Sequence, residues 1–184
     1  MIDGLIRQKS KIPVELLDYK YNFIIPNLSL NNNRGSEIYN PPYEWAGIGL
    51  NVIKKYNNID WLKKDNDSWA IAYYGFGKFL SSTQIGNMLN DIIVKGKFKK
   101  ELSIKCPELD IRHNGKRVGV GIYLSPNVKT AERNCGIFTF DEKRYKIVLM
   151  AKVLINKIKE PEDHSFWILN EDDIRIYRIL VKEI

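Results

Sequence analysis

The sequence predicts an α+β domain that is rich in sheet. Three observations carry this prediction: short apolar runs of strand-like composition, one clearly amphipathic helical segment with a shorter one after it, and turn-forming residues between them. The chain has 184 residues, enough for one domain with a core of its own. The apolar runs, in chain order, cover residues 69–75, 122–124, 137–140, 145–155, 166–169 and 174–181.

Composition and charge narrow the function classes. The chain carries 29 Lys and Arg against 22 Asp and Glu, a net charge of +7, which favours anionic partners such as nucleotides, RNA or acidic proteins. The two cysteines and two histidines, at positions 106, 135, 113 and 164, lack the spacing of a metal site. No apolar run reaches the roughly 20 residues that span a bilayer, and the N-terminus lacks a secretory pattern. We expect an intracellular protein, cytoplasmic or nuclear, without a membrane partner.

The first 68 residues differ in character from the rest. Prolines and an asparagine tract interrupt them too often for long elements, although residues 21–25 can form one short strand. Two glycines in residues 45–52 indicate a close backbone approach, but the third glycine and the preceding strand of a dinucleotide fingerprint are missing. We therefore expect residues 1–68 to form an irregular arm that packs on a domain of residues 69–184.

The first apolar run is followed by the clearest helix. Residues 69–75 have the composition of a buried strand. Ser81 or Ser82 can cap a helix, and Gly96 can end it. The apolar residues of this helix recur at helical spacing and predict a core-facing stripe: Ile85, Met88, Leu89, Ile92 and Ile93.

Residues 95–117 form the most basic stretch of the chain. Pro107, the Asn114-Gly115 pair and the weak periodicity predict a loop. This loop is either a solvated charged segment or one that faces phosphate or nucleic acid. Aromatic residues do not alternate with the basic ones as stacking platforms for single strands would, so a nucleic-acid binder is the least favoured function.

The segment after this loop has the features of a ligand-binding junction. Gly119 and Gly121 allow a tight turn or a close approach, and residues 122–124 predict a strand end. Ser125 then predicts a helix N-cap with Pro126 at the first helical position. Three residues fall on one face of the predicted helix, and a glycine is positioned to end it: Val128, Ala131, Cys135 and Gly136.

The C-terminal part predicts the centre of the sheet. Residues 145–155 are almost continuously apolar, as in a central strand that is buried on both faces. Residues 174–181 alternate and predict a closing strand. By the period-two count of a strand, Glu171 lies on the same face as Asp173.

Three segments, in this order, resemble the catalytic domain of poly(ADP-ribose) polymerase-like ADP-ribosyltransferases, the diphtheria-toxin-like class. Residues 72–75 (Ala-Tyr-Tyr-Gly) stand where the family has a strand ending in His-Gly. Residues 119–131, with Gly-Val-Gly-Ile-Tyr and Lys-Thr-Ala, are similar to its Gly-x-Gly-Ile-Tyr and Lys-Ser-Ala stretches. Residues 169–177 are similar to its closing strand, which begins at the catalytic glutamate. The resemblance covers residues 69–182.

The resemblance implies two small packed sheets, mostly antiparallel, that enclose a cleft for NAD. The family's His-Tyr-Glu triad corresponds to Tyr74, Tyr123 and Asp173, with Glu171 as the alternative carboxylate. Tyr123 would stack on the nicotinamide ring, and Tyr74 would occupy the position that holds the adenosine ribose. The remaining contacts with NAD would come from the Gly75 backbone, the Thr130 hydroxyl and the Gly-Val-Gly turn at Gly121.

The resemblance implies two functions with different activity. In one, the domain binds NAD and transfers a single ADP-ribose to a protein or nucleic-acid acceptor; the shorter carboxylate of Asp173 argues against polymer synthesis. In the other, the domain is a catalytically inactive interaction module. Two losses favour this function: only the central tyrosine of the three triad positions is retained, and the family's second stacking tyrosine is replaced in the segment around Asn134.

Overall fold

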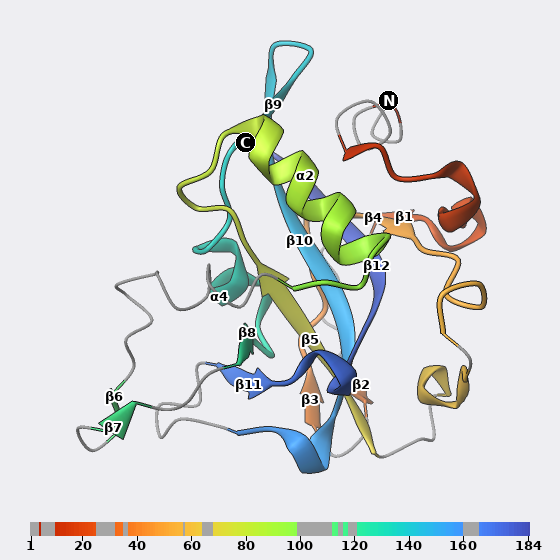
Figure 1. The fold of residues 1–184 in the computed structure, drawn as a ribbon, viewed down its shortest axis with the longest axis vertical. Coiled ribbons are helices and arrows are strands. Elements are labelled where there is room, and N and C mark those ends of the chain that lie inside the picture. Colours follow the sequence, from red (N-terminus) through yellow and green to blue (C-terminus); the bar gives the residue numbers. More distant parts are fainter. Residues whose placement is uncertain are drawn as a thin grey trace.

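A computed structural model of the chain describes residues 4, 10–24, 32–34, 37–56, 58–63, 68–98, 112–113, 116–117, 121–159 and 166–184. The fold is α+β, and all strand pairs described are antiparallel (Figure 1). The main sheet has the strand order β1 (Phe23–Ile24), β4 (Ala46–Gly49), β12 (Ile174–Glu183), β10 (Lys143–Leu154) and β5 (Trp69–Gly75), with β9 (Phe138–Phe140) also paired to β10. This outcome confirms the α+β class.

Smaller elements surround the main sheet. A second, two-stranded sheet joins β8 (Ile122–Leu124) to β11 (Trp167–Leu169). Two short hairpins are β2 (Asn32–Arg34) with β3 (Glu37–Tyr39) and β6 (Arg112–His113) with β7 (Lys116–Arg117). The helices described are α2 (Ser82–Ile93), α4 (Val128–Glu132) and the 3-10 turns η1 (Val14–Leu16), η2 (Tyr19–Tyr21), η3 (Asp60–Leu62), η5 (Ile155–Lys157) and η6 (Glu171–Asp173).

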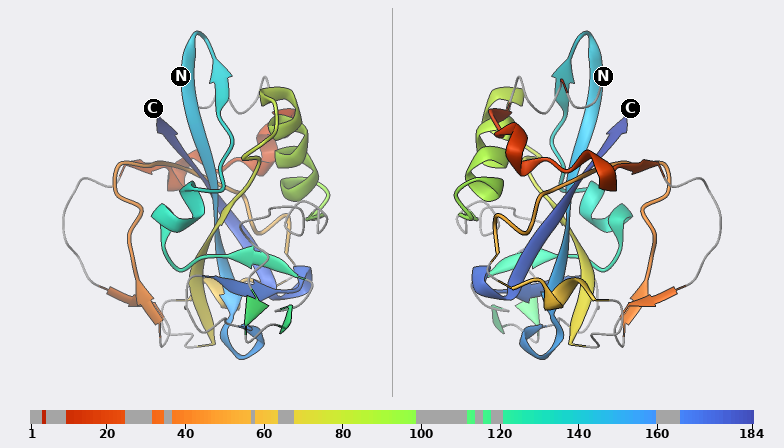
Figure 2. Two further views of the ribbon diagram at one scale, coloured as in Figure 1. Left: turned by 90° about the vertical axis from the view of Figure 1, so that its left-hand side faces the viewer. Right: turned by 90° about the vertical axis from the view of Figure 1, so that its right-hand side faces the viewer.

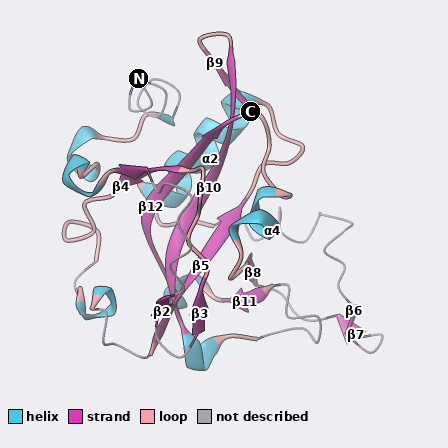
Figure 3. Ribbon diagram, turned by 180° about the vertical axis from the view of Figure 1, so that it is seen from behind, coloured by secondary structure: helices cyan, strands magenta, loops and turns pink. Residues whose placement is uncertain are grey.

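The two helices cover opposite faces of the main sheet, as Figure 2 shows. Successive residues of β10 therefore enter different cores: Leu149 packs with α2 residues, and Val148 packs with α4 residues. Both faces of β10 are buried because both carry a helix, which confirms the prediction for residues 145–155. Seen from behind, β12, β10 and β5 form the long centre of the sheet (Figure 3).

Helix α2 begins as its sequence predicts. Ser81 is the N-cap, and its hydroxyl accepts a hydrogen bond from the Gln84 N–H while the Gln84 side chain accepts one from the Ser81 N–H. The predicted apolar stripe is buried against the sheet. Gly96, with φ of +67°, lies just beyond the end of the helix at Ile93.

Helix α4 differs from its prediction at both ends. Its N-cap is Asn127, whose side chain accepts a hydrogen bond from the Lys129 N–H. Ser125 is instead bound through its backbone to β5, so it cannot adopt the cap position. The helix ends at Glu132, and Gly136 has another role: its N–H donates to the Phe76 carbonyl. The predicted burial of Val128, Ala131 and Cys135 is confirmed.

The N-terminal region contributes directly to the main sheet. β1 lies within the predicted strand 21–25, and β4 pairs with β12 through Gly47, Ile48 and Gly49. Two glycines in β4 allow close packing, since a Cβ at Gly47 would overlap the Phe23 ring and one at Gly49 would overlap the Asp18 carbonyl. The division of the chain at residue 68 stays a prediction.

Two further expectations concern the membrane and the basic loop. Among the described residues, no helix has the length and apolarity needed to cross a bilayer. Most of the basic stretch 95–117 lies outside the described residues; the parts described include the hairpin of β6 and β7.

Candidate functional site

The β5–β8 junction unites two of the segments that carry the resemblance. The Tyr73 N–H donates to the Ser125 carbonyl at 2.8 Å, and the Ser125 N–H donates to the Tyr73 carbonyl at 2.9 Å. This antiparallel bridge ties the end of β5 to the residue that follows β8. Continued by two residues, its register sets Tyr123 opposite Gly75.

The backbone of Gly75 faces this junction. In an antiparallel strand, the N–H and C=O groups of residues i and i+2 point to the same side. Both backbone groups of Tyr73 point towards β8, so those of Gly75 do as well. Among the described residues, no hydrogen bond to these two Gly75 groups is found on this side. An adjacent donor and acceptor of this kind complement a primary carboxamide.

Helix α4 lies directly against Gly75. A Cβ at this position would overlap the backbone carbonyl of Ala131, so the close approach requires glycine. Thr130 is half-buried and precedes Ala131 in the same helix. The structure therefore brings Gly75, Tyr123 and the Thr130 segment to one junction.

Tyr123 itself is half-buried on β8. Its neighbours Ile122 and Leu124 point into the core that α2 covers, whereas Tyr123 lies outside that core. Its ring meets the Phe166 ring edge-on, with the centroids 6.5 Å apart. Gly121 is buried against β11, since a Cβ there would meet Ile168 and the Leu169 carbonyl.

Tyr74 does not join this junction with its side chain. The ring is buried in the core on the α2 side, stacked on Phe76 at 5.7 Å and edge-on to Phe98 at 5.4 Å. Burial, with a smaller contribution from Cys135, raises the pKa of the Tyr74 hydroxyl far above its ordinary value. The phenol is therefore neutral and acts as a packed core group.

The predicted carboxylates lie elsewhere along the sheet. In the main sheet, Ile174 pairs with Val153, which in turn pairs with Ala70, whereas Gly75 pairs with Val148. Ala70 and Gly75 are five residues apart on β5, which is about 16 Å along the strand. Asp173, which precedes Ile174, thus lies towards the other end of the strand from Gly75.

Residues 171–173 form a 3-10 turn and not a strand. With three residues per turn, Glu171 and Asp173 do not share a face, so the period-two count is wrong here. Asn170 is the N-cap of this turn, and β12 begins directly after it at Ile174. Glu171 lies at the wall of a cavity, to which Asp172 also contributes.

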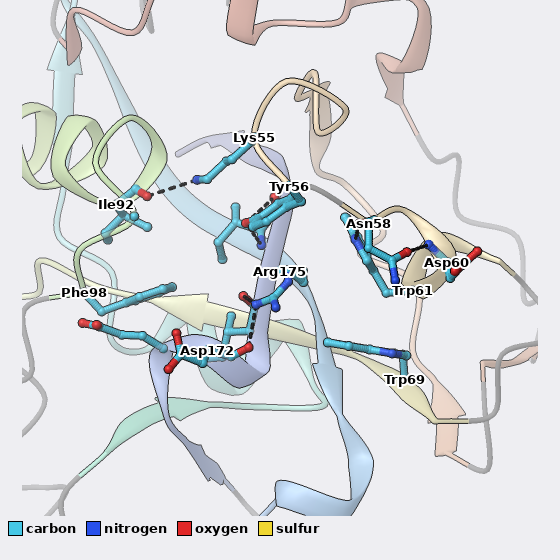
Figure 4. Close-up of a pocket in the computed structure, with 14 residues that line it drawn as sticks. Lys55, Tyr56, Asn58, Asp60, Trp61, Trp69, Ile92, Phe98, Asp172 and Arg175 are labelled. Carbon is cyan, nitrogen blue, oxygen red and sulfur yellow. Dashed lines mark hydrogen bonds between the residues drawn. The ribbon is translucent and has the colours of Figure 1, made fainter.

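This cavity, the Arg175 cavity, has a volume of about 590 Å³ (Figure 4). The Arg175 guanidinium donates to the carbonyls of Asp172 at 2.6 Å and Ile174 at 3.0 Å. Its carbon lies 5.2 Å from the centre of the Tyr56 ring and 5.7 Å from that of Trp69. Both distances are within the range of cation–π contacts, so two aromatic rings stabilise the Arg175 cation in addition to its two hydrogen bonds.

Lys55 provides the second cation of the Arg175 cavity. Its Nζ donates to the Ile92 carbonyl at 3.2 Å and lies 5.6 Å from the centre of the Tyr56 ring. Burial lowers the pKa of this ammonium to about 8. A wall of aromatic faces, two cations and the carboxylates of Glu171 and Asp172 suits a flat ligand with charged groups.

The stability of the protein should depend on pH through Lys55. Between pH 8 and 10.5 the unfolded chain holds a proton on Lys55 that the folded chain has lost, so the free energy of unfolding rises with pH there. We expect the difference in unfolding free energy between wild type and Lys55→Met to grow in favour of wild type from pH 7.5 to pH 9.5. Urea titrations at fixed ionic strength measure it. Parallel pH profiles of the two proteins would contradict the buried ammonium.

Sequence reasoning missed the residues that build the Arg175 cavity. Lys55, Tyr56, Trp61 and Trp69 come from the segment interpreted as an irregular arm and from the start of β5. The available signal was the density of aromatic residues between positions 43 and 69, which is high for a solvated arm. Their meeting with Arg175 depends on tertiary structure.

Two negative findings, on metal-ligating residues and on related proteins, complete the description of the site. The described residues contain no group of three or more metal-ligating side chains. The sequence matches no protein-family model and no curated protein.

Proposed function

We propose that the chain is a divergent ADP-ribosyltransferase-fold domain that binds NAD, with the nicotinamide end at the β5–β8 junction. The observation that carries the proposal is the backbone edge of Gly75, whose N–H and C=O face Tyr123 with no described partner. A nicotinamide carboxamide would use both groups, and the Tyr123 ring would stack on the pyridine ring. Thr130 directly precedes Ala131, whose carbonyl lies against Gly75, and in this proposal its hydroxyl would supply a third contact.

The reaction that such a site would support is the transfer of a single ADP-ribose. The bond from nicotinamide to ribose breaks, nicotinamide leaves, and the ribose carbon forms a bond to an acceptor that loses a proton. The ribose passes through an oxocarbenium-like state, which a nearby carboxylate stabilises. Asp173, with Glu171 as the alternative, is the carboxylate that the resemblance implies for this role.

One observation favours the second candidate, an inactive interaction module. Tyr74 stands at the family's histidine position, and its ring is buried between Phe76 and Phe98. A side chain so packed offers no hydrogen bond to a ribose in the cleft. Asp173 precedes Ile174, whose position in the sheet is about 16 Å along the strand from Gly75, and this separation also favours an inactive module.

Incubation of the purified chain with NAD separates the two candidates. We expect NAD to raise the melting temperature, and nicotinamide release by chromatography to report whether transfer or hydrolysis follows. A thermal shift without release would identify an NAD-binding pseudoenzyme. If millimolar NAD produces no thermal shift and no nicotinamide release, the proposal is overturned and the interaction module remains.

A further inference from the structure

A second cavity, the Arg178 cavity, lies away from the junction. It has a volume of about 510 Å³ and lies against β5, β10 and β12 and the N-terminal segment around η2 and η3. Its charged lining residues are two cations, Arg178 and Lys152, and one carboxylate, Asp18, and two tyrosines, Tyr39 and Tyr177, also line it. Most of the remaining wall is apolar, including Leu50, Ile71 and Met150.

A β-bulge aims two adjacent side chains at this cavity. On β12, Arg178 pairs with Met150 and Ile176 pairs with Ala151, so Tyr177 is the extra residue. The alternation of faces shifts there: Ile176 and Ile179 both enter the core on the α2 side. Tyr177 and Arg178 therefore both line the cavity, which a regular strand would not allow.

The Arg178 guanidinium lies beside two aromatic rings, and one of its nitrogens has no hydrogen-bond partner. Its carbon lies 4.7 Å from the centre of the Phe23 ring and 5.2 Å from that of Tyr177. Its Nε is buried and has no hydrogen-bond partner. Within the described part of the chain it forms no ion pair. Partial burial of a cation without an anionic partner is costly, and an anion bound in the cavity beside Arg178 would offset that cost through its charge.

Hydroxyl groups and a second cation surround the same place. The charge of Arg178 acts on the buried Tyr73 hydroxyl, which donates to the Asn40 carbonyl at 2.6 Å and also bonds with Tyr39. Lys152 is only 5% exposed, and its Nζ donates to the Trp69 carbonyl at 3.2 Å. Among the charged residues that line the cavity, Arg178 and Lys152 outweigh Asp18, so the lining carries a net positive charge.

The outer end is apolar. Four lining residues there are large, hydrophobic and exposed, with 72% of Ile53 accessible to solvent: Tyr21, Ile53, Ile59 and Leu62. Exposed apolar side chains that continue into a cavity mark a ligand entrance more often than a plain surface. The gradient from an apolar rim to a cationic inner end fits a molecule with one anionic end.

We propose that the Arg178 cavity binds a small amphipathic carboxylate, with its carboxylate at Arg178 and its apolar body along Leu50, Ile71 and Met150. A carboxylate accepts charge-assisted hydrogen bonds from a guanidinium, and these are stronger than hydrogen bonds between neutral groups. The site is distinct from the β5–β8 junction and does not depend on NAD binding.

Decanoate, below its micelle-forming concentration, is the probe, and calorimetric titration of the full chain measures its binding. We expect decanoate to bind, and acetate and 1-decanol each to bind about tenfold more weakly or worse, because each lacks one end of the ligand. In Arg178→Met, decanoate affinity should fall by about tenfold or more. Arg144→Met removes the same charge at an exposed position of β10 and should leave the affinity unchanged.

Each other outcome counts against the proposal. Equal binding of 1-decanol and decanoate would show an apolar crevice without a carboxylate site. Equal binding of acetate and decanoate would show an adventitious anion site. If Arg178→Met does not fold, the comparison of decanoate, acetate and 1-decanol on wild type still decides, since it leaves Arg178 intact. An absence of decanoate binding at millimolar concentration would overturn the proposal outright.

Discussion

Replacing Gly75 by alanine is expected to lower the free energy of unfolding by about 3 kcal/mol. The added Cβ would overlap the backbone carbonyl of Ala131, and a backbone group cannot rotate away as a side-chain end can. Either α4 moves off the sheet or the end of β5 bends. Both movements open the core around Val128 and Cys135, which α4 buries.

Urea unfolding followed by circular dichroism measures this loss. Gly4→Ala is the matched control, because a Cβ at Gly4 meets no atom within 4 Å, and its unfolding free energy should not fall below that of wild type. A Gly75→Ala protein as stable as the control would show that α4 does not press on the end of β5. The junction as described would then be wrong.

Replacing Tyr123 by alanine is expected to weaken NAD binding about 30-fold. Stacking of a base-like ring on an aromatic side chain contributes about 2 kcal/mol, which corresponds to that factor. Tyr123 is half-buried and lies outside both main cores, so the loss should fall on binding more than on stability. Its edge contact with Phe166 would be lost as well.

Tyr123→Phe is the control for this variant. It keeps the ring and removes the hydroxyl, so NAD affinity should remain within about threefold of wild type if stacking is the main contact. Calorimetric titration gives both affinities, and circular dichroism confirms that the variants fold. Equal affinity of Tyr123→Ala and wild type would remove Tyr123 from the proposed site.

The sequence predicted the strands and α2 because local patterns specify them. The run at 145–155 has no polar face, and both faces of β10 are indeed covered. The Ser81 cap and its stripe of apolar residues follow from helix chemistry within one segment. In β10 and α2 the tertiary contacts agree with the local preferences of the sequence.

Predictions failed where a distant segment competes for the same backbone. Ser125 has a good N-cap side chain, but its N–H and carbonyl are engaged by Tyr73, so the helix starts after Asn127. The turn at Glu171–Asp173 depends on how β11 joins β12, which the strand count did not include. Local propensity cannot report such long-range bonds.

The two cavities lay beyond sequence reasoning for the same physical reason. The Arg175 cavity needs Lys55, Trp69 and Arg175, which come from three separate segments. The Arg178 cavity needs a bulge whose position depends on the register between β10 and β12. Residues 69–75 were correctly predicted to be a buried strand, but the position of the Tyr74 ring in the core on the α2 side depends on tertiary packing. The assignment of Gly75, Tyr123 and Thr130 to an NAD site stays a prediction.

The Gly75 amide gives the most direct test of the proposed nicotinamide site. Its resonance can be followed by two-dimensional ¹H–¹⁵N NMR while nicotinamide, and then NAD, is added to the labelled chain. We predict that the Gly75 signal shifts and saturates with both ligands, because its N–H would donate to the carboxamide oxygen in each complex. A Gly75 signal that stays unmoved at saturating nicotinamide and NAD would contradict binding at the β5–β8 junction.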